Sequence, residues 1–222
     1  LRPGRNLKEI SERLDAVEEM TGSLIRLKRL TTVLDDIHDI ERLLSRVTME
    51  TASPRDLLSL RESLARLPDL LQALEEYEAL ALSPEIDLLE DVVDELCRGL
   101  HDEAPASLSD GGIIRKGYSE TLDELRKVAT SGKSYIAGME KQERERTGIS
   151  SLKVKYNKVF GYFIEVTKTH LSSVPDDYVR KQTLVNSERY ITPELKEYED
   201  KILGAEERIQ ELERELFLEL RR

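Results

Sequence analysis

The chain has 222 residues, of which 36% are charged, a formal net charge of −11 and a single cysteine, Cys97. One cysteine excludes a disulfide scaffold and fits a reducing compartment, so we expect a cytoplasmic protein. No run of about 18 uncharged apolar residues is present, which argues against a membrane-spanning helix and predicts no membrane partner. Because the chain starts at Leu1 without a methionine or a targeting signal, we expect a piece of a longer protein.

The first half of the chain has the apolar spacing of helices. Apolar residues recur there at steps of three and four, which places them on one helix face. One such stripe consists of Leu7, Ile10, Leu14 and Val17. We expect five or six helices packed as an irregular bundle, the last of which ends near Gly99, with Cys97 as a small buried apolar residue near that end.

Serine and proline mark the breaks between these helices. Ser53-Pro54 predicts a helix start, with serine as the N-cap and proline in the first turn. Pro68 and Ser83-Pro84-Glu85 indicate further breaks. Residues 101–116 are rich in turn-forming residues and are expected to be a connector.

Two long helices are predicted in the second half, over residues 117–148 and 192–222. The apolar seam of the first has heptad spacing and comprises Leu122, Leu125, Ala129, Gly132, Ile136 and Met139. The seam of the second comprises Leu195, Tyr198, Ile202, Ala205, Ile209, Leu212, Leu216 and Leu220. Helices of this length span roughly 40–45 Å and are expected to pair as antiparallel neighbours.

Residues 149–191 change in character and are rich in β-branched and aromatic residues. Their alternation predicts three or four antiparallel strands, with turns at Pro175-Asp176-Asp177 and Val185-Asn186-Ser187. The aromatic residues are expected to serve core and cross-strand packing rather than base stacking. The fold class is therefore mainly α: a multi-helix core over residues 1–116 and two long antiparallel helices that carry a small antiparallel β insert.

Charge is distributed unevenly between this insert and the rest of the chain. Residues 149–191 contain seven basic and four acidic residues, a net charge of +3, whereas the remainder has a net charge of −14. A basic tip on an acidic body presents one cationic surface to a polyanion. An ordinary helical hairpin with a tip of no special function is the alternative.

No motif of the chain indicates catalysis or metal binding. His38, His101 and His170 are isolated from one another and from Cys97, without the spacing of metal ligands. Gly132-Lys133-Ser134 is similar to the end of a phosphate-binding loop but lies in the middle of a predicted helix. No pair of carboxylates is selected by its position, so we predict neither a cofactor nor an enzymatic activity for this chain.

Long stretches of the chain resemble the MutS family of bacterial DNA mismatch repair proteins. Residues 152–166 (LKVKYNKVFGYFIEV), 178–184 (YVRKQTL) and 186–197 (NSERYITPELKE) are similar to the DNA clamp of that family. Residues 110–126 and 143–149 resemble the lever helix that leads to the clamp, and residues 10–17 and 41–57 resemble the family's core. The resemblance covers nearly the whole chain.

The resemblance implies a fragment with lever and clamp functions. A complete member of the family binds mismatched double-stranded DNA as a homodimer, acts with a MutL-type repair partner, and holds ATP and magnesium in a C-terminal ATPase domain. The phosphate-binding loop of that ATPase does not occur in this sequence, and we expect the mismatch-reading domain with its Phe-x-Glu wedge to lie outside this chain. The division implied is a core over residues 1–116, a lever helix over 117–148, a clamp over 149–191 and a returning lever helix over 192–222.

The resemblance also names candidate DNA-backbone contacts. By motif position, Lys181, Asn186 and Arg189 are the expected phosphate contacts. Weaker candidates in the same segment are Arg180, Lys158, Lys155 and Lys153. For each of them the alternative is an ordinary solvated side chain, and Val185 stands where many relatives have a basic residue.

Two other functions remain open at this point. The chain is alternatively a structural coiled-coil arm whose tip binds a protein partner, or part of a MutS-family paralogue that acts on recombination intermediates. A seam that pairs between chains would favour the first alternative.

Overall fold

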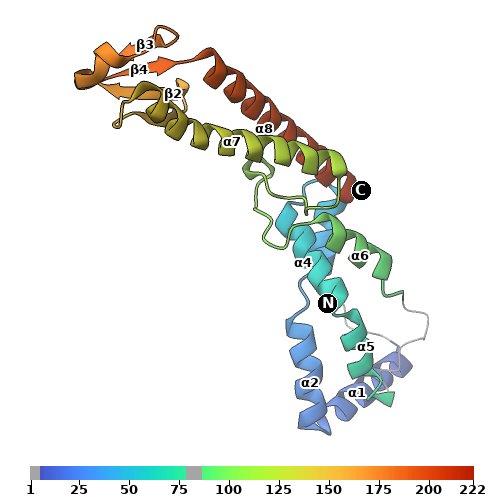
Figure 1. The fold of residues 1–222 in the computed structure, drawn as a ribbon. Helices are drawn as coiled ribbons and strands as arrows, with labels where there is room; N and C mark the ends of the chain where they lie inside the picture. The colour runs from blue at the N-terminus through green and yellow to red at the C-terminus, as the bar shows by residue number, and fades with distance from the viewer. Residues whose placement is uncertain (1–5, 79–86) are drawn as a thin grey trace. The chain divides into compact units, whose positions relative to one another are not determined.

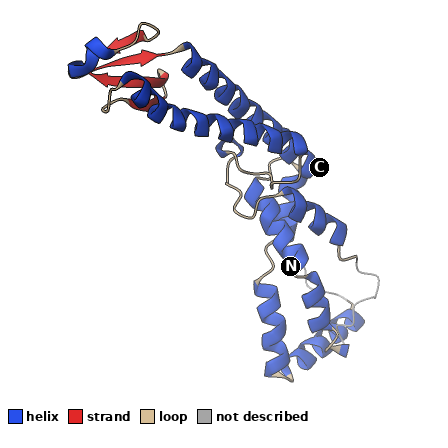
Figure 2. Ribbon diagram, in the orientation of Figure 1, coloured by secondary structure: helices blue, strands red, loops and turns tan. Residues whose placement is uncertain are grey.

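The computed structural model describes residues 6–78 and 87–222 (Figure 1). The predicted break at Ser83-Pro84-Glu85 lies outside the described residues. Helices predominate and one small antiparallel sheet is present, as the mainly α prediction requires (Figure 2). The chain divides into two compact units, the first formed by Leu1–Tyr118 with Arg214–Arg222 and the second by Ser119–Glu213.

The first unit is helical, and its described helices agree with the expected breaks. They are α1 (Leu7–Thr21), α2 (Leu24–Asp35), α3 (Ile40–Thr48), α4 (Pro54–Ala65), α5 (Leu67–Leu74) and α6 (Glu90–Gly99). The connector after α6 contains a short 3₁₀ turn, η2 (Leu108–Asp110), and an isolated bridge between Leu100 and Ile114. Pro68 lies in the first turn of α5, where a missing N–H costs no intrahelical hydrogen bond.

The start of α4 is a capping box, as the Ser53-Pro54 motif predicts. Ser53 Oγ accepts a hydrogen bond from Asp56 N at 3.3 Å, and Ser53 N donates to Asp56 Oδ2 at 2.8 Å. Burial raises the pKa of Asp56, but the hydrogen bonds from Ser53 and the charge of Arg46 outweigh it and hold the pKa below its usual value.

Two separate apolar clusters support the first unit. Leu30 of α2 packs with Ala73 and Tyr77, and Leu43 of α3 packs with Leu60 and Leu64 of α4. The predicted stripe on α1 is helical but lies mainly in solvent, since Leu7 is 83% exposed and Leu14 63%.

The expectation for Cys97 was wrong, because its side chain is exposed. In α6 the buried residues are Leu96 and Gly99. Cys97 follows Leu96 directly, and one residue turns a helix by about 100°, which takes its side chain off the buried face.

The second unit contains the two long helices, α7 (Glu120–Thr147) and most of α8 (Pro193–Leu220), each of 28 residues. The predicted seam of α7 is buried at Leu122, Ala129, Gly132, Ile136 and Met139. Ser119 Oγ caps the start of α7, and Gly148, with φ +72°, ends it. Glycine is suited to this left-handed cap because it has no Cβ.

Side chains join α7 and α8 as an antiparallel pair. Arg126 Nη2 lies 2.5 Å from Glu213 Oε1, and Lys133 Nζ lies 2.5 Å from Glu206 Oε1. Towards the sheet, the rings of Tyr135 and Tyr198 stack with centroids 3.8 Å apart.

Gly132 has a packing role at this interface. A Cβ built on Gly132 would lie 2.6 Å from Ile202 Cγ1, so the two helices approach each other closely at this point. The heptad spacing places Gly132 in the seam but gives no signal for this close approach, because a glycine inside a helix is by itself only unfavourable.

The sheet lies at the end of the pair where α7 stops and α8 starts (Figure 1). Its strands are β1 (Lys153–Asn157), β2 (Gly161–Thr167), β3 (Val179–Thr183) and β4 (Ser187–Ile191), in the order β1-β2-β4-β3 with every neighbour antiparallel. The 3₁₀ segment η3 (Lys168–Ser173) follows β2. Both predicted turns are present, one before β3 and one between β3 and β4.

One face of the sheet, here called the core face, packs on the helices. Ile164, Val166 and Tyr190 form a cluster with Ile136 and Met139 of α7, and Leu195 and Ile202 of α8 join them. Alternate residues of the same strands point to the opposite side, here called the outer face.

Candidate nucleic-acid interface

The outer face of the sheet carries three of the six candidate cations. Strand alternation and register place Lys153 and Lys155 of β1 there, with Glu165 of β2 and Arg189 of β4. Lys153 is the register partner of Glu165, which in turn is the partner of Arg189. This face therefore has three basic side chains around one carboxylate.

Glu165 is shared between two of these cations. Its Oε1 lies 2.7 Å from Lys155 Nζ, and its Oε2 lies 3.5 Å from Arg189 Nε. The hydrogen bond from Lys155 outweighs burial, with help from the charge of Arg189, and lowers the pKa of Glu165. The carboxylate is therefore ionised at neutral pH and offsets part of the positive charge of the face.

Arg189 is held flat on the outer face. Its guanidinium carbon lies 4.3 Å above the ring centroid of Phe163, and its Nη1 donates to Gln182 Oε1 at 2.9 Å. Its Nε is buried without a hydrogen-bond acceptor among the described residues. The side chain is thus pre-positioned by a cation–π contact and one hydrogen bond, with donor capacity left over.

Lys181 is the extra residue of a β-bulge. Arg180 pairs with Tyr190 and Gln182 pairs with Arg189, so the register shifts by one residue between them. The bulge places Arg180 on the core face and Gln182 on the outer face, which simple alternation would not do. Lys181 itself is exposed on the edge strand β3.

Arg180 differs from the other candidates because it lies on the core face. Its Nη1 is 3.6 Å from Glu188 Oε1, and the buried Glu188 also accepts a hydrogen bond from Tyr190 Oη at 2.6 Å. Burial, followed by this hydrogen bond, raises the pKa of Tyr190 to about 12. Arg180 therefore helps to neutralise a buried carboxylate, although its side chain remains 64% exposed.

The turn between β3 and β4 places Asn186 beside a lysine that sequence reasoning did not select. Asn186 is exposed, and its carbonyl oxygen accepts a hydrogen bond from Lys168 N at 3.1 Å. Lys168 is the first residue of η3 and is also exposed. Only the pairing of β2 with β4 brings residues 168 and 186 together, so the sequence alone gave no signal for it.

Lys158 lies at the other end of the sheet, in the β1–β2 hairpin turn next to Val159 and Phe160. Lys153 and Asn186 belong to the opposite end, because Lys153 starts β1 and Asn186 precedes β4. Thus the structure groups Lys153, Lys155, Arg189 and the β3–β4 turn, and it separates Lys158 from that turn.

Four cations of the sheet region have no carboxylate within 4.0 Å among the described residues: Lys153, Lys158, Lys168 and Lys181. In contrast, Lys155, Arg180 and Arg189 are paired. A net charge counted from the sequence does not distinguish these two classes.

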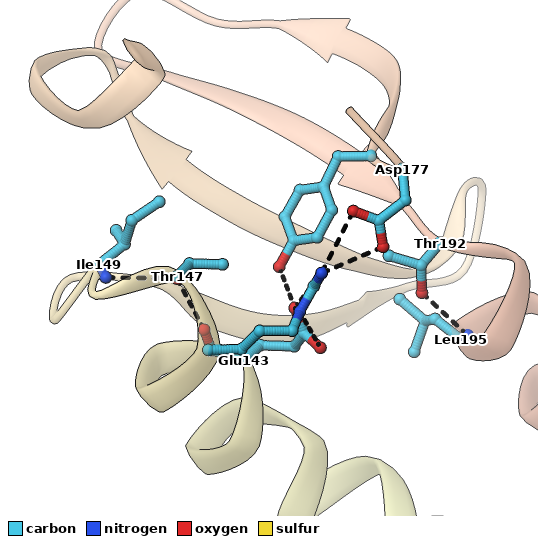
Figure 3. A network of polar contacts seen from close by, with 8 residues as sticks. Glu143, Thr147, Ile149, Asp177, Thr192 and Leu195 are labelled. Carbon is cyan, nitrogen blue, oxygen red and sulfur yellow. Dashed lines mark hydrogen bonds and ion pairs between the residues drawn. The ribbon is translucent and has the colours of Figure 1, made fainter. Parts of the chain in front are cut away.

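A polar network around the buried carboxylate of Glu143 fixes the sheet region on α7 (Figure 3). Tyr178 Oη donates to Glu143 Oε2 at 2.6 Å, and Arg146 Nη2 donates to the same oxygen at 2.8 Å. Arg146 also reaches Asp177 Oδ2 at 3.1 Å. Burial and the bond to Glu143 raise the pKa of Tyr178, so its hydroxyl remains a donor. Sequence reasoning missed Glu143, because a glutamate late in a charged helix resembles a solvated residue.

Threonine side chains cap the chain next to this network, both where α7 leads into the sheet and where the sheet leads into α8 (Figure 3). Thr147 Oγ1 accepts from Ile149 N at 3.2 Å where α7 ends, and the buried Thr192 Oγ1 accepts from Leu195 N at 3.1 Å where α8 begins. Further back on α7, Glu140 Oε2 accepts from Val154 N at 2.9 Å and so covers the edge of β1.

The described residues offer no cluster of three or more histidine, cysteine, aspartate or glutamate side chains that would hold a metal ion. Lys133, in the segment that is similar to the end of a phosphate-binding loop, lies within α7. Its hydrogen bond to Glu206 raises its pKa. No helix in the part of the chain that the structure describes has the length and apolarity to cross a bilayer.

Comparison with known proteins agrees with this architecture. Residues 117–208 match the model of MutS family domain IV. Over 99% of its length the chain is 48% identical to the DNA mismatch repair protein MutS of Symbiobacterium thermophilum, and 49% identical to that of Methanothrix thermoacetophila, covering 26% of each. It is 50% identical, over its whole length, to the MutS of Salinibacter ruber, covering 25% of that protein.

The fold defines the class: a mainly α protein in which two long antiparallel helices carry a small antiparallel sheet. Matches of about half identity along the whole chain then establish the family, and the chain belongs to the MutS family. It spans about a quarter of the length of the curated relatives it matches.

Proposed function

We propose that the chain is the core, lever and clamp part of a DNA mismatch repair protein, and that its sheet holds duplex DNA by the phosphate backbone. The observation that supports this most directly is the outer face, where Lys153, Lys155 and Arg189 surround one carboxylate. The exposed Lys181 and Asn186 lie at the β3 edge and the β3–β4 turn of the same sheet. Contacts of this kind position a protein on DNA without reading its sequence.

The aromatic residues of the sheet favour backbone contact over base stacking. Tyr162 and Tyr190 belong to the cluster on the core face, and Tyr178 is tied to Glu143. Phe163, on the outer face, is only 3% exposed beneath Arg189. A stacking platform needs open ring faces, which these residues do not provide. Tyr156 and Phe160 are about half exposed, but they lie at the β1–β2 hairpin end of the sheet, away from the β3–β4 turn.

In the proposed mechanism α7 and α8 transmit movement to the sheet. The seam of α7 and the close approach at Gly132 stiffen the pair, and the Glu143 network fixes the sheet to α7. A displacement of the pair would therefore move the sheet with it. The ATPase that would drive this motion, the second protomer of a homodimer and a MutL-type partner belong to the proposal for the whole protein.

The same packing bears on the coiled-coil alternative. An arm that pairs with another chain needs a free apolar seam, but Ala129, Gly132 and Ile136 are already buried within the unit. We therefore favour the DNA-binding function. A role in recombination intermediates would use the same phosphate contacts, and substrate preference of the whole protein separates it from mismatch repair.

Binding to a labelled duplex at low salt tests the proposal. We expect the double variant Lys181→Glu, Arg189→Glu to lose about tenfold or more in affinity, because both changes place negative charge against phosphates. The control Lys127→Glu, Lys141→Glu changes the net charge equally on exposed positions of α7 and is expected to bind much better. Equal retention by the two double variants would contradict the assignment.

We further propose that the chain does not turn over ATP. Phosphate release assayed with the purified chain is expected to equal the buffer blank. ATP turnover that disappears in Lys133→Ala would contradict this proposal, since Lys133 belongs to the one segment whose sequence is similar to a phosphate-binding loop.

A further inference from the structure

One carboxylate, that of Glu165, offsets part of the positive charge of the outer face. Glu165 lies in the middle of the row formed by Lys153, Glu165 and Arg189 and is 20% exposed. Lys155 Nζ, at 2.7 Å, is in full hydrogen-bond contact with its carboxylate. A phosphate that binds Lys155 must therefore compete with a carboxylate already in place.

The carboxylate of Glu165 lies closer to Lys155 than to Arg189. While Oε1 accepts the hydrogen bond from Lys155, Oε2 remains 3.5 Å from Arg189 Nε, which has no acceptor among the described residues. Release of Lys155 would leave the carboxylate free to engage Arg189 more closely. The unsatisfied Nε therefore lowers the cost of exchanging the partner of Lys155.

We propose that Glu165 is a positioning residue that masks Lys155 in the free protein, and that a DNA phosphate displaces it from Lys155 on binding. The proposal rests on the DNA-binding function proposed above. It divides the cations of β1 into two classes: Lys153, two residues away on the same face, has no carboxylate within 4.0 Å among the described residues and contributes fully, whereas Lys155 contributes only after the exchange.

This pair of lysines provides a matched test in the full chain. Binding to a labelled duplex is measured from about 20 to 150 mM salt for Lys153→Gln and Lys155→Gln. Each phosphate contact adds about 0.9 to the slope of log affinity against log salt, so Lys153→Gln is expected to lower the slope by that amount. Lys155→Gln is expected to lower it by less than about half as much. Equal losses would overturn the proposal.

Removal of the carboxylate provides the second test. Glu165→Gln is expected to tighten binding about threefold, because the phosphate no longer has to displace a carboxylate from Lys155. The salt slope is expected to steepen by at least about half of 0.9, which is the part of a phosphate contact that Lys155 does not contribute in the wild type. In this background Lys155→Gln and Lys153→Gln are expected to cost equal affinity. A folded Glu165→Gln variant that binds no more tightly than wild type would overturn the proposal.

Two controls keep the outcomes distinct. Asp176→Asn removes one negative charge from an exposed residue of the same insert that has no cation within 4.0 Å among the described residues, and it is expected to change affinity by less than about 1.5-fold. If Lys181→Glu, Arg189→Glu binds as well as wild type, the proposed function fails. If that variant loses binding but Glu165→Gln gains none, only the role of Glu165 fails.

Discussion

The two faces of the four-stranded sheet differ in how their charged side chains are paired. On the core face Glu188 is buried against Tyr190 and Arg180, and close by Glu143 is buried against Tyr178 and Arg146. On the outer face three cations surround the single carboxylate of Glu165, and two of them, Lys155 and Arg189, are paired with it. The buried carboxylates are fully committed to protein partners, whereas the outer face keeps an excess of positive charge.

This difference separates structural from binding charges. A buried carboxylate with two donors is costly to disturb, because the remaining partners lose their hydrogen bonds in a poorly solvated place. An exposed lysine without a partner adds little to stability but is available to a phosphate. We therefore expect changes beside the core face to affect stability and changes on the outer face to affect DNA binding.

The largest effect is expected at the network between α7 and the sheet. Glu143→Ala removes the acceptor of Tyr178 and Arg146, so we expect a loss of about 3 kcal/mol in the free energy of unfolding. Urea unfolding followed by circular dichroism measures it. The control Glu145→Ala removes a glutamate that is 69% exposed and is expected to cost less than about 0.5 kcal/mol. Similar losses for both variants would contradict the structural role of the buried carboxylate.

A smaller effect is expected where the two long helices meet. Gly132→Ala places a Cβ 2.6 Å from Ile202 Cγ1, and we expect a net loss of about 1–2 kcal/mol. Gly138→Ala, on the same helix with no atom within 4 Å of the new Cβ, is expected to stabilise by about 0.5–1 kcal/mol. Thermal unfolding of the two variants gives the sign directly, and a stabilised Gly132→Ala would contradict the close approach.

A change of moderate size is expected in DNA binding when Lys168 is neutralised. Lys168→Gln is expected to weaken duplex binding about threefold, since an exposed and unpaired cation beside Asn186 is lost. Stability is expected to change by less than about 0.5 kcal/mol. Lys127→Gln, about 30 Å along α7 from the end of that helix, serves as the control and is expected to leave binding unchanged. Weaker binding by the control alone would place the interface on the helices.

The smallest effect concerns acid stability. Lys155 holds the pKa of Glu165 below its ordinary value of 4.5, so the stability that this pair contributes is present above pH 4.5 and is lost as the pH falls through the lowered pKa. We expect about 0.5 kcal/mol. Unfolding of wild type and Glu165→Gln from pH 6 to pH 3 measures the difference, which should shrink towards low pH. A difference that grows towards low pH would contradict the assignment.

Much of the fold was predictable because local signals agree with it. The serine–proline start of α4, the heptad seam of α7 and the alternation in β2 each specify their element within a few residues. The exposed stripe of α1 shows the limit of such signals, because apolar spacing predicts a helix but does not say what covers it.

The candidate site was less predictable, since it depends on contacts between strands. Pairing of β2 with β4 brings Lys168 to Asn186 and Glu165 to Arg189, and no spacing along the chain reveals either. The bulge at Lys181 likewise has no sequence signal, because the polar residues around it show no alternation that a shift would break. The assignment of DNA contacts to these residues remains a prediction.

Lysine footprinting tests the central claim most directly. The chain is acetylated with and without duplex DNA at low salt, and the modification of each lysine is read by mass spectrometry. We predict that DNA protects Lys153, Lys168 and Lys181 of the sheet region and leaves Lys127 and Lys141 of α7 unprotected. Protection of the α7 lysines with the sheet lysines still modified would contradict the account.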